Sequence, residues 1–180
     1  MTDIVTLGID PSLTSTGLSF AGQTISIQPD TRGVQRLVEV RDRIMYTVIH
    51  NAVSCVAIEH YSYASRNSQA HSIGELGGVI RVALYEANIP TVEIPPTCRA
   101  KFATGKGNAG KPEVVSAISA RTGIVWSGGD GSDRCDAWVL EEMLRYKLGL
   151  SVLDWPKSHL DALEKVDWSP LEPITKGIGK

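Results

Sequence analysis

The first strand of this chain ends in a carboxylate, and this feature constrains the fold more than any other. Residues 4–9 alternate and then run continuously apolar, which is typical of a strand buried on both faces of a sheet. Asp10 and Pro11 follow, and proline ends the strand because it lacks an amide donor and restricts the residue before it. A carboxylate at the end of a buried strand is costly unless a cation meets it. Asp10 therefore either starts an Asp-Pro turn or belongs to a polar site.

The order of the predicted elements indicates an α/β fold with one mixed sheet. Strands are predicted at residues 4–9, 17–21, 24–28, 54–59 and 91–94. The second and third are joined at Gly22-Gln23, so that a hairpin follows the first strand and completes an antiparallel meander. Helical periodicity predicts helices at residues 32–52, 70–88, 97–103, 112–122 and 133–148, with a further short helix at 157–166.

The 180 residues suit a single domain, which buries about 70% of the surface of its extended chain. No apolar run approaches the length of a membrane span and no signal sequence opens the chain, so we expect a cytoplasmic protein without a membrane partner. Cys55, Cys98 and Cys135 are dispersed and are expected to be free, buried thiols. Composition changes after Gly149, which indicates an appended, partly mobile segment at residues 151–180.

Three further acids could meet Asp10 at one edge of the sheet. Glu59 ends a second buried strand, and Asp133 and Asp136, three residues apart, share one face of the last long helix. Together these carboxylates would repel strongly, and divalent cations remove that cost. Mg²⁺ prefers oxygen ligands of this kind. The alternative is that the helix acids only complement the helix dipole; the set of four, with two at strand ends, favours a metal site.

A basic segment lies between these acids. The net charge of −2 argues against a generic polyanion binder, yet residues 99–121 carry five cations against the single acid Glu113. These cations are Arg99, Lys101, Lys106, Lys111 and Arg121. The glycines around Lys106 suit a phosphate-binding loop, although the GK[ST] ending of a P-loop is absent and a solvated surface loop is the alternative.

Four segments resemble, in their order along the chain, the motif regions of RuvC-type Holliday junction resolvases, most closely a short bacteriophage version: GIDPSLTSTG, AIEHYSYASRN, TGKGNAGKPEVV and SDRCDAWVL. The resemblance spans residues 4–144 and implies a ribonuclease H-like fold, in which a three-stranded meander and then two parallel strands form a five-stranded sheet flanked by helices. It implies a nuclease domain at residues 1–150. The family's catalytic and metal-binding acids carry over to Asp10, Glu59, Asp133 and Asp136, and its loop lysines to Lys111 and, as a poorer match, Lys101.

The resemblance also implies an activity and partners. The family cuts four-way DNA junctions or other branched DNA by paired nicks, using two Mg²⁺ per active site, with Mn²⁺ expected to substitute, and leaving 5′-phosphate and 3′-hydroxyl ends. Paired nicks need two active sites, so a homodimer is expected, with the helix carrying Gly74, Gly77 and Gly78 as candidate interface. DNA contacts are expected from the lysines at 101, 106 and 111.

Two departures from the family pattern concern recognition of the junction. Ser12 stands where the family usually has glycine, and the loop after Glu59 is about one residue longer than in the family. Because of the extra residue, either Tyr61 or Tyr63 is the candidate for stacking on an unpaired base, and Arg66 is the candidate for contacting a phosphate. Two other functions are compatible with parts of the sequence. A non-catalytic junction-binding protein would not need all four acids, and an actin-like or sugar-kinase-like phosphotransferase needs two such domains and a longer chain.

Overall fold

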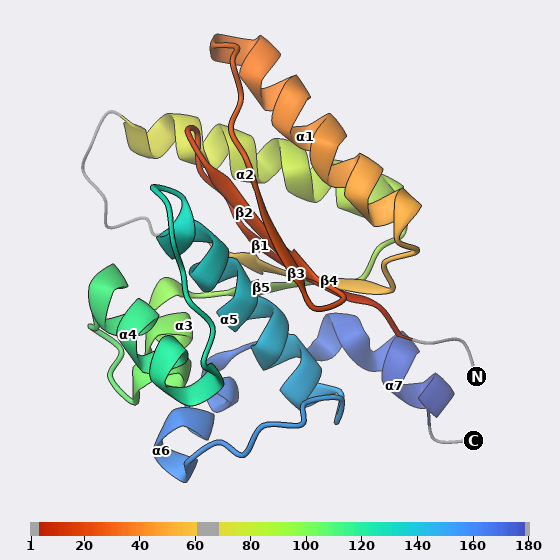
Figure 1. The fold of residues 1–180 in the computed structure, drawn as a ribbon. Coiled ribbons are helices and arrows are strands. Elements are labelled where there is room, and N and C mark those ends of the chain that lie inside the picture. Colours follow the sequence, from red (N-terminus) through yellow and green to blue (C-terminus); the bar gives the residue numbers. More distant parts are fainter. Residues whose placement is uncertain (1–3, 61–68, 179–180) are drawn as a thin grey trace.

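A computed structural model describes residues 4–60 and 69–178 of the chain. Five strands form one sheet in the order β3-β2-β1-β4-β5, and helices cover both of its faces (Figure 1). The strands are β1 (Thr6–Asp10), β2 (Thr16–Phe20), β3 (Gln23–Ile27), β4 (Cys55–Glu59) and β5 (Thr91–Ile94). β1, β2 and β3 pair antiparallel, whereas β4 pairs parallel to β1 and β5 parallel to β4, which confirms the predicted mixed sheet.

The hairpin between β2 and β3 turns one residue earlier than predicted. Ala21 and Gly22 have φ angles of +49° and +75°, and Phe20 pairs with Gln23 across the turn. A two-residue hairpin turn of type I′ has positive φ at both central residues, and its twist matches that of the flanking strands. Gly22 adopts such a conformation without strain, which explains why the turn forms at this position.

The helices divide into two layers (Figure 1). α1 (Gly33–His50) and α2 (Gln69–Glu86) cover one face of the sheet, and α5 (Gly131–Lys147) crosses the other face together with α3 (Pro96–Thr104) and α4 (Lys111–Thr122). The chain then continues through α6 (Lys157–Leu160), two 3₁₀ turns at Leu163–Lys165 and Ser169–Leu171, and α7 (Glu172–Ile178). The helix predicted at residues 157–166 is thus split into a helical turn and a 3₁₀ turn.

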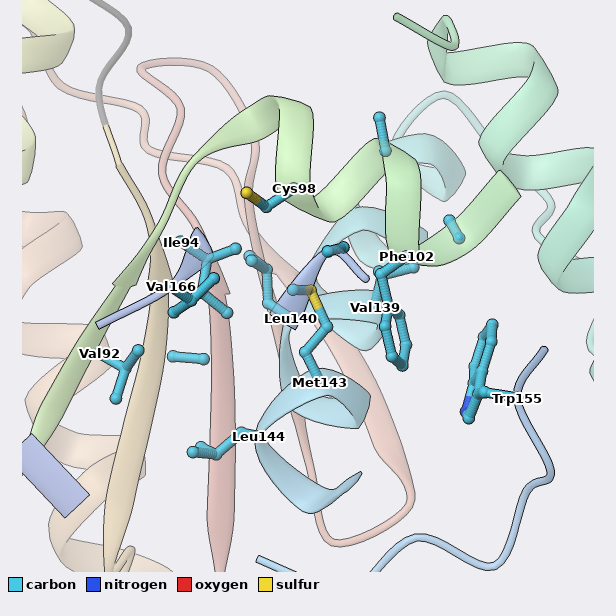
Figure 2. Close-up of a cluster of buried hydrophobic side chains, with 14 of the residues drawn as sticks. Val92, Ile94, Cys98, Phe102, Val139, Leu140, Met143, Leu144, Trp155 and Val166 are labelled. Atoms are coloured by element: carbon cyan, nitrogen blue, oxygen red, sulfur yellow. The ribbon is translucent and has the colours of Figure 1, made fainter. Parts of the chain in front are cut away.

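Each face of the sheet has its own core. Leu7 and Ile9 of β1 point to the first face and pack with Ile44 of α1 and Leu76 of α2. On the second face, Leu140 and Met143 of α5 are among the fully buried side chains, in a cluster with Phe102 of α3 and Ile94 of β5 (Figure 2). Cys55, Cys98 and Cys135 are free, buried thiols, as predicted.

Two glycines allow α5 to lie directly on the sheet. A Cβ atom at Gly8 of β1 would lie 2.1 Å from the carbonyl oxygen of Ala137, and one at Gly17 of β2 would lie 2.1 Å from the carbonyl oxygen of Asp133. No side chain fits in either place, so only glycine permits this approach. Since the two strands are neighbours, the glycines set both the height and the position of the first turns of α5.

The segment after residue 150 packs against the same core as the rest of the chain. Trp155, Ala162, Val166 and Leu171 are all buried in the cluster that contains Phe102. The rings of Phe102 and Trp155 have centroids 4.2 Å apart. The domain boundary at residue 150 stays a prediction, while these contacts connect the extension to α3. Within the described part of the chain, no helix is both long and apolar enough to cross a membrane.

Candidate active site

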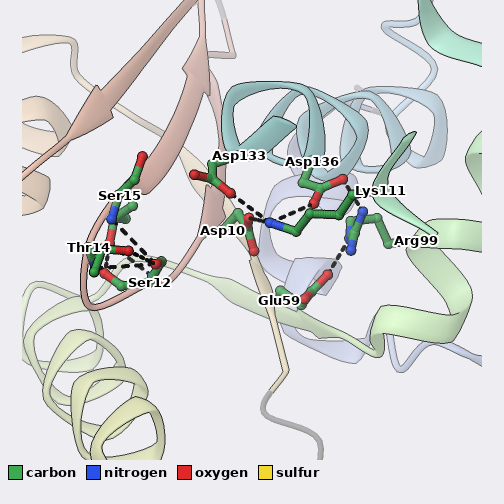
Figure 3. A network of polar contacts seen from close by, with 10 residues as sticks. Asp10, Ser12, Thr14, Ser15, Glu59, Arg99, Lys111, Asp133 and Asp136 are labelled. Carbon is green, nitrogen blue, oxygen red and sulfur yellow. Dashed lines mark hydrogen bonds and ion pairs between the residues drawn. The ribbon is translucent and has the colours of Figure 1, made fainter. Parts of the chain in front are cut away.

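The four acids predicted to form a site converge at one edge of the sheet (Figure 3). β1 and β4 run parallel with Ile9 opposite Ile58, so Asp10 and Glu59, each one residue further on, end neighbouring strands at the same edge. α5 contributes Asp133 from its first turn and Asp136 one turn later. Asp136 is 1% exposed and Asp10 6% exposed, so both are carboxylates with little access to water.

The turn after β1 is held by hydroxyl groups, and the side chain of Asp10 lies among the other acids (Figure 3). The hydroxyl of Thr16 donates to the carbonyl oxygen of Ser12 at 2.8 Å, and the amide of Ser12 donates back to that hydroxyl at 3.1 Å. The hydroxyl of Ser12, the residue that departs from the family pattern, accepts from the amide of Thr14 at 3.3 Å. The turn thus has its own hydrogen bonds, and Asp10 is a member of the acid cluster.

Lys111, the first residue of α4, places its ammonium group between three of the acids. Its Nζ lies 2.6 Å from Oδ1 of Asp133, 3.6 Å from Oδ2 of Asp136 and 4.0 Å from Oδ2 of Asp10. Burial acts to lower the pKa of Lys111, but the hydrogen bond to Asp133 and the neighbouring carboxylates raise it above its ordinary value. The amine is therefore charged, and its side chain is half-exposed at the mouth of the site.

Arg99 of α3 is the second cation among the acids. Its Nε donates to Oε2 of Glu59 and its Nη1 donates to Oδ1 of Asp136, so one guanidinium joins a strand acid to a helix acid. The residue is 7% exposed. Burial acts to lower its pKa, but the charges of Glu59 and Asp136 raise the pKa above the ordinary arginine value, so Arg99 is permanently charged.

The acids themselves are held in an environment that disfavours their charged forms. Burial raises the pKa of Asp136 to about 6, although the charges of Arg99 and Lys111 act to lower it. Burial, followed by the charges of Glu59 and Asp136, raises the pKa of Asp10 well above its usual range. Two resident cations therefore do not fully compensate the buried carboxylates, which is the situation in which an additional cation is stabilising.

The donor set fits a hard divalent cation. All four predicted ligands are carboxylates, and Oδ2 of Asp136 is a buried oxygen that receives no hydrogen bond from any residue the structure describes. Within the same described ranges no three acidic, His or Cys side chains yet surround one point as a metal-binding group. Arg99 and Lys111 lie between the acids instead.

A cleft opens beside Asp10 and Glu59. It measures about 300 Å³ and is lined by Asp10, Glu59 and Lys111 on the side of the acids, and by Gly77 and Arg81 of α2 on the other. Two of the four acids, Asp10 and Glu59, therefore line the cleft together with Lys111.

The remaining predicted residues have different placements. Lys106 is exposed in the turn after α3, whereas Lys101 points to the C-terminal extension, with Nζ 3.7 Å from Oδ2 of Asp161. The structure therefore brings Lys111, and not Lys101, to the acids. Tyr61, Tyr63 and Arg66 lie outside the described residues.

Sequence reasoning missed Arg99 as a member of the site, because it counted this residue only as one charge of the basic segment. A signal was present in the sequence. The apolar residues Phe102 and Ala103 follow Arg99 at i+3 and i+4, which places the arginine on the buried side of α3. Periodicity alone does not say which acids a buried arginine meets.

An acidic cluster at the carboxyl ends of the two central parallel strands, on a sheet of order β3-β2-β1-β4-β5, defines a protein of the ribonuclease H-like class. The family model described as "Crossover junction endodeoxyribonuclease RuvC" matches residues 6–121. The chain therefore belongs to the RuvC family. The matched range includes Asp10, Glu59, Arg99 and Lys111 and ends before the two acids of α5. The assignment also removes the kinase-like alternative.

Individual relatives agree with this assignment. The chain is 24% identical over 135 residues to the crossover junction endodeoxyribonuclease RuvC of Thermus thermophilus, covering 67% of this chain and 81% of that protein. It is 30% identical over 125 residues to the protein of the same name from Sorangium cellulosum, covering 63% and 70%. Two solved structures of Thermus thermophilus RuvC, one in complex with a Holliday junction substrate, have TM-scores of 0.62 and 0.63 at 21% identity, over 82% of this chain and 98% of theirs. They show the same fold.

Proposed function

We propose that this chain is a metal-dependent endonuclease that resolves four-way or otherwise branched DNA by paired nicks, leaving 5′-phosphate and 3′-hydroxyl ends. The observation that carries the proposal is the convergence of four carboxylates and Lys111 at one edge of the sheet, beside an open cleft. The relatives named as crossover junction endodeoxyribonucleases support the same activity. Within this proposal the enzyme acts in the cytoplasm.

Asp10, Glu59, Asp133 and Asp136 would hold Mg²⁺, two ions per active site, with Mn²⁺ able to substitute. When bound, such ions activate a water molecule and stabilise the leaving oxygen of a phosphodiester. Asp136 keeps one carboxylate oxygen without a hydrogen-bond partner among the described residues, and this atom supports the role of the residue as a ligand. Asp10, at the end of β1, supplies a second buried carboxylate.

Lys111 would bind the phosphate that is cut. Its charged amine is half-exposed and already lies against three acids, so it can contact an oxygen of a phosphate that enters the cleft. Lys106, exposed in the preceding turn, would contact the DNA backbone further out. Lys101 would first have to leave Asp161, so it is less well placed than the other two.

Recognition of the branch point would come from the loop that follows β4. Phosphate contacts alone do not distinguish a junction from a duplex, because both present the same charges. Tyr61 and Tyr63 follow Glu59 by two and four residues, so an aromatic ring stacking on an unpaired base would lie near the acids, with Arg66 on a phosphate. Replacing both tyrosines by alanine should reduce junction cleavage far more than duplex or flap cleavage, and equal losses on all substrates would contradict this role.

Paired nicks would require a homodimer, with α2 as the proposed interface. A Cβ atom added at Gly74, Gly77 or Gly78 would meet no atom of the described structure within 4 Å, so this helix face has room for a close neighbour. Sedimentation of the purified protein tests the proposal, and a monomer at the concentrations that support cleavage would refute it.

The central experiment compares a labelled four-way junction with a linear duplex of the same sequence, with and without Mg²⁺. Wild-type protein should cut the junction only with the metal, and Asp10→Asn should bind the junction but fail to cut it, because the amide keeps the shape of the side chain and loses its charge. Near wild-type cleavage by the Asn variant in a single turnover would contradict the assignment of Asp10. Binding by wild-type protein without any cleavage would favour the non-catalytic alternative.

A further inference from the structure

Arg99 differs from an ordinary surface cation in the way it is held. It lies in α3 between the buried residues Cys98 and Ala100, and its guanidinium bonds to one oxygen of Glu59 and one oxygen of Asp136. Its side chain is 9% exposed, whereas that of Lys111 is 52% exposed. The lysine can therefore swing out to meet a substrate, but the arginine is fixed inside the site.

The two bonds of Arg99 are divided between the two elements that build the site. Glu59 comes from β4 and Asp136 from α5. Among the described ion pairs, Arg99 is the only cation that contacts an acid on each of these two elements. The guanidinium is planar and presents its donors in a rigid fork, so each carboxylate is held in one orientation. For Asp136 this orientation leaves Oδ2, the atom without a hydrogen-bond partner in the described structure, directed to the side of Lys111.

We propose that Arg99 is a positioning residue that holds Glu59 and Asp136 in place before a metal ion binds, and that divalent cations compete with it for these two carboxylates. The inference rests on the proposed metal-dependent function and goes beyond it, since it assigns to this arginine the control of how tightly the carboxylates take up metal.

The sign of the effect follows from charge and burial. A fixed positive charge next to the ligands repels an incoming divalent ion, and this repulsion is strong because the surroundings are poor in water. The same two carboxylates that bind the metal are those that stabilise Arg99, so by linkage each cation weakens the binding of the other. Removing the arginine charge should therefore tighten metal binding, although it destabilises the metal-free protein by leaving two acids without their partner.

The test measures free Mn²⁺ by electron paramagnetic resonance during titration of the purified protein without DNA. Arg99→Met removes the charge and keeps much of the side-chain length, Arg99→Lys keeps the charge, and Arg145→Met is the matched control, since Arg145 pairs with Glu142 nearer the other end of α5. We expect Arg99→Met to lower the half-saturating Mn²⁺ concentration by about tenfold. The control and Arg99→Lys should stay within about twofold of wild type, because both keep the charge beside Glu59 and Asp136.

Thermal denaturation gives a second readout of the same variants. Without metal, Arg99→Met should melt below wild type, and saturating Mn²⁺ should raise its melting temperature by more than it raises that of wild type. A variant that needs Mn²⁺ in order to fold supports the proposal. A variant whose melting temperature is equally low with and without Mn²⁺ contradicts it.

A measurement on unmodified protein keeps the inference testable whatever the Met variant does. In ¹⁵N-labelled protein the Nε–H signal of Arg99, assigned by its loss in Arg99→Lys, should shift during a Mg²⁺ titration with the midpoint of metal binding. A signal unmoved at saturating metal would overturn the competition, as would equal or weaker Mn²⁺ binding by Arg99→Met. Failure of wild-type protein to bind Mn²⁺ at all is a different result: it would overturn the proposed metal site, and this inference with it.

Discussion

The packing of α5 on Gly17 leads to a prediction about how the acids are positioned. Gly17 lies opposite Asp10 in the β1–β2 register, and a Cβ atom added to it would lie 2.1 Å from the carbonyl oxygen of Asp133 and 2.6 Å from its carbonyl carbon. Ordinary contact begins at 3.4 Å, so the difference between 3.4 and 2.1 Å requires Gly17→Ala to displace the start of α5 by about 1.3 Å. That displacement moves Asp133 away from Asp10 and Lys111.

The expected losses follow from this displacement. Overpacking of this kind costs about 1–3 kcal/mol of the free energy of unfolding. A misplacement of about 1 Å at reacting groups reduces turnover by roughly 10²-fold. For a chain of this length each kcal/mol corresponds to about 2–4 °C, so Gly17→Ala should melt roughly 2–12 °C below wild type.

The assay is single-turnover cleavage of a labelled four-way junction, performed well below the melting temperature of the variant so that only folded protein is compared. Gly129→Ala is the control, because its added Cβ meets nothing within 4 Å in the described structure and Gly129 is exposed just before α5. If Gly17→Ala cleaves and melts like Gly129→Ala, the close contact between β2 and α5 does not position Asp133.

Three further predictions concern the cations, a buried acid and the C-terminal extension. Lys111→Ala should slow single-turnover cleavage by about 10²-fold, as expected for loss of one group that stabilises the transition state. The affinity of wild-type protein for the junction should fall steeply as the salt concentration rises, and a flat plot of log affinity against log salt would contradict the phosphate-contact role. Glu141 accepts hydrogen bonds from Thr6 and Ser19, and burial raises the pKa of its carboxyl group above the ordinary value of 4.5. The protonated carboxyl group therefore stabilises the fold fully below pH 4.5, and this stabilisation is lost as the pH rises through the raised pKa of the folded protein. Glu141→Gln should therefore raise the melting temperature at neutral pH and lose this advantage below pH 4.5, and an advantage independent of pH would refute the assignment. Trp155→Ala should lower the free energy of unfolding in urea by about 3–5 kcal/mol, whereas Val152→Ala, at a position 91% exposed, should leave it unchanged; equal curves for the two variants would mean that the extension does not stabilise the core.

Much of the fold follows from local pattern. The buried runs that end at Asp10 and Glu59 are strands, the helical periodicity places Asp133 and Asp136 on one face, and the structure shows all of these elements within a few residues of the predicted bounds. The edge of the sheet at which the acids meet is also predictable from the sequence, because the parallel strands that end at Asp10 and Glu59 end at the same side of the sheet. The extension was harder to interpret. Its change in composition favoured an appended segment, and only the tertiary structure shows that Trp155, Val166 and Leu171 are buried in the same core as Phe102.

By itself the sequence determined the elements, the mixed sheet and the candidate acids, since these depend on periodicity and on residues a few positions apart. The tertiary structure decided which cations meet the acids: Arg99 reaches Glu59 across 40 residues and Asp136 across 37, while Lys101 in the same helix turns to Asp161. It also decided how closely α5 approaches Gly17. The physical reason is that charge compensation and close packing depend on distances between side chains on different elements, and these distances are set only when the layers of the fold are packed together.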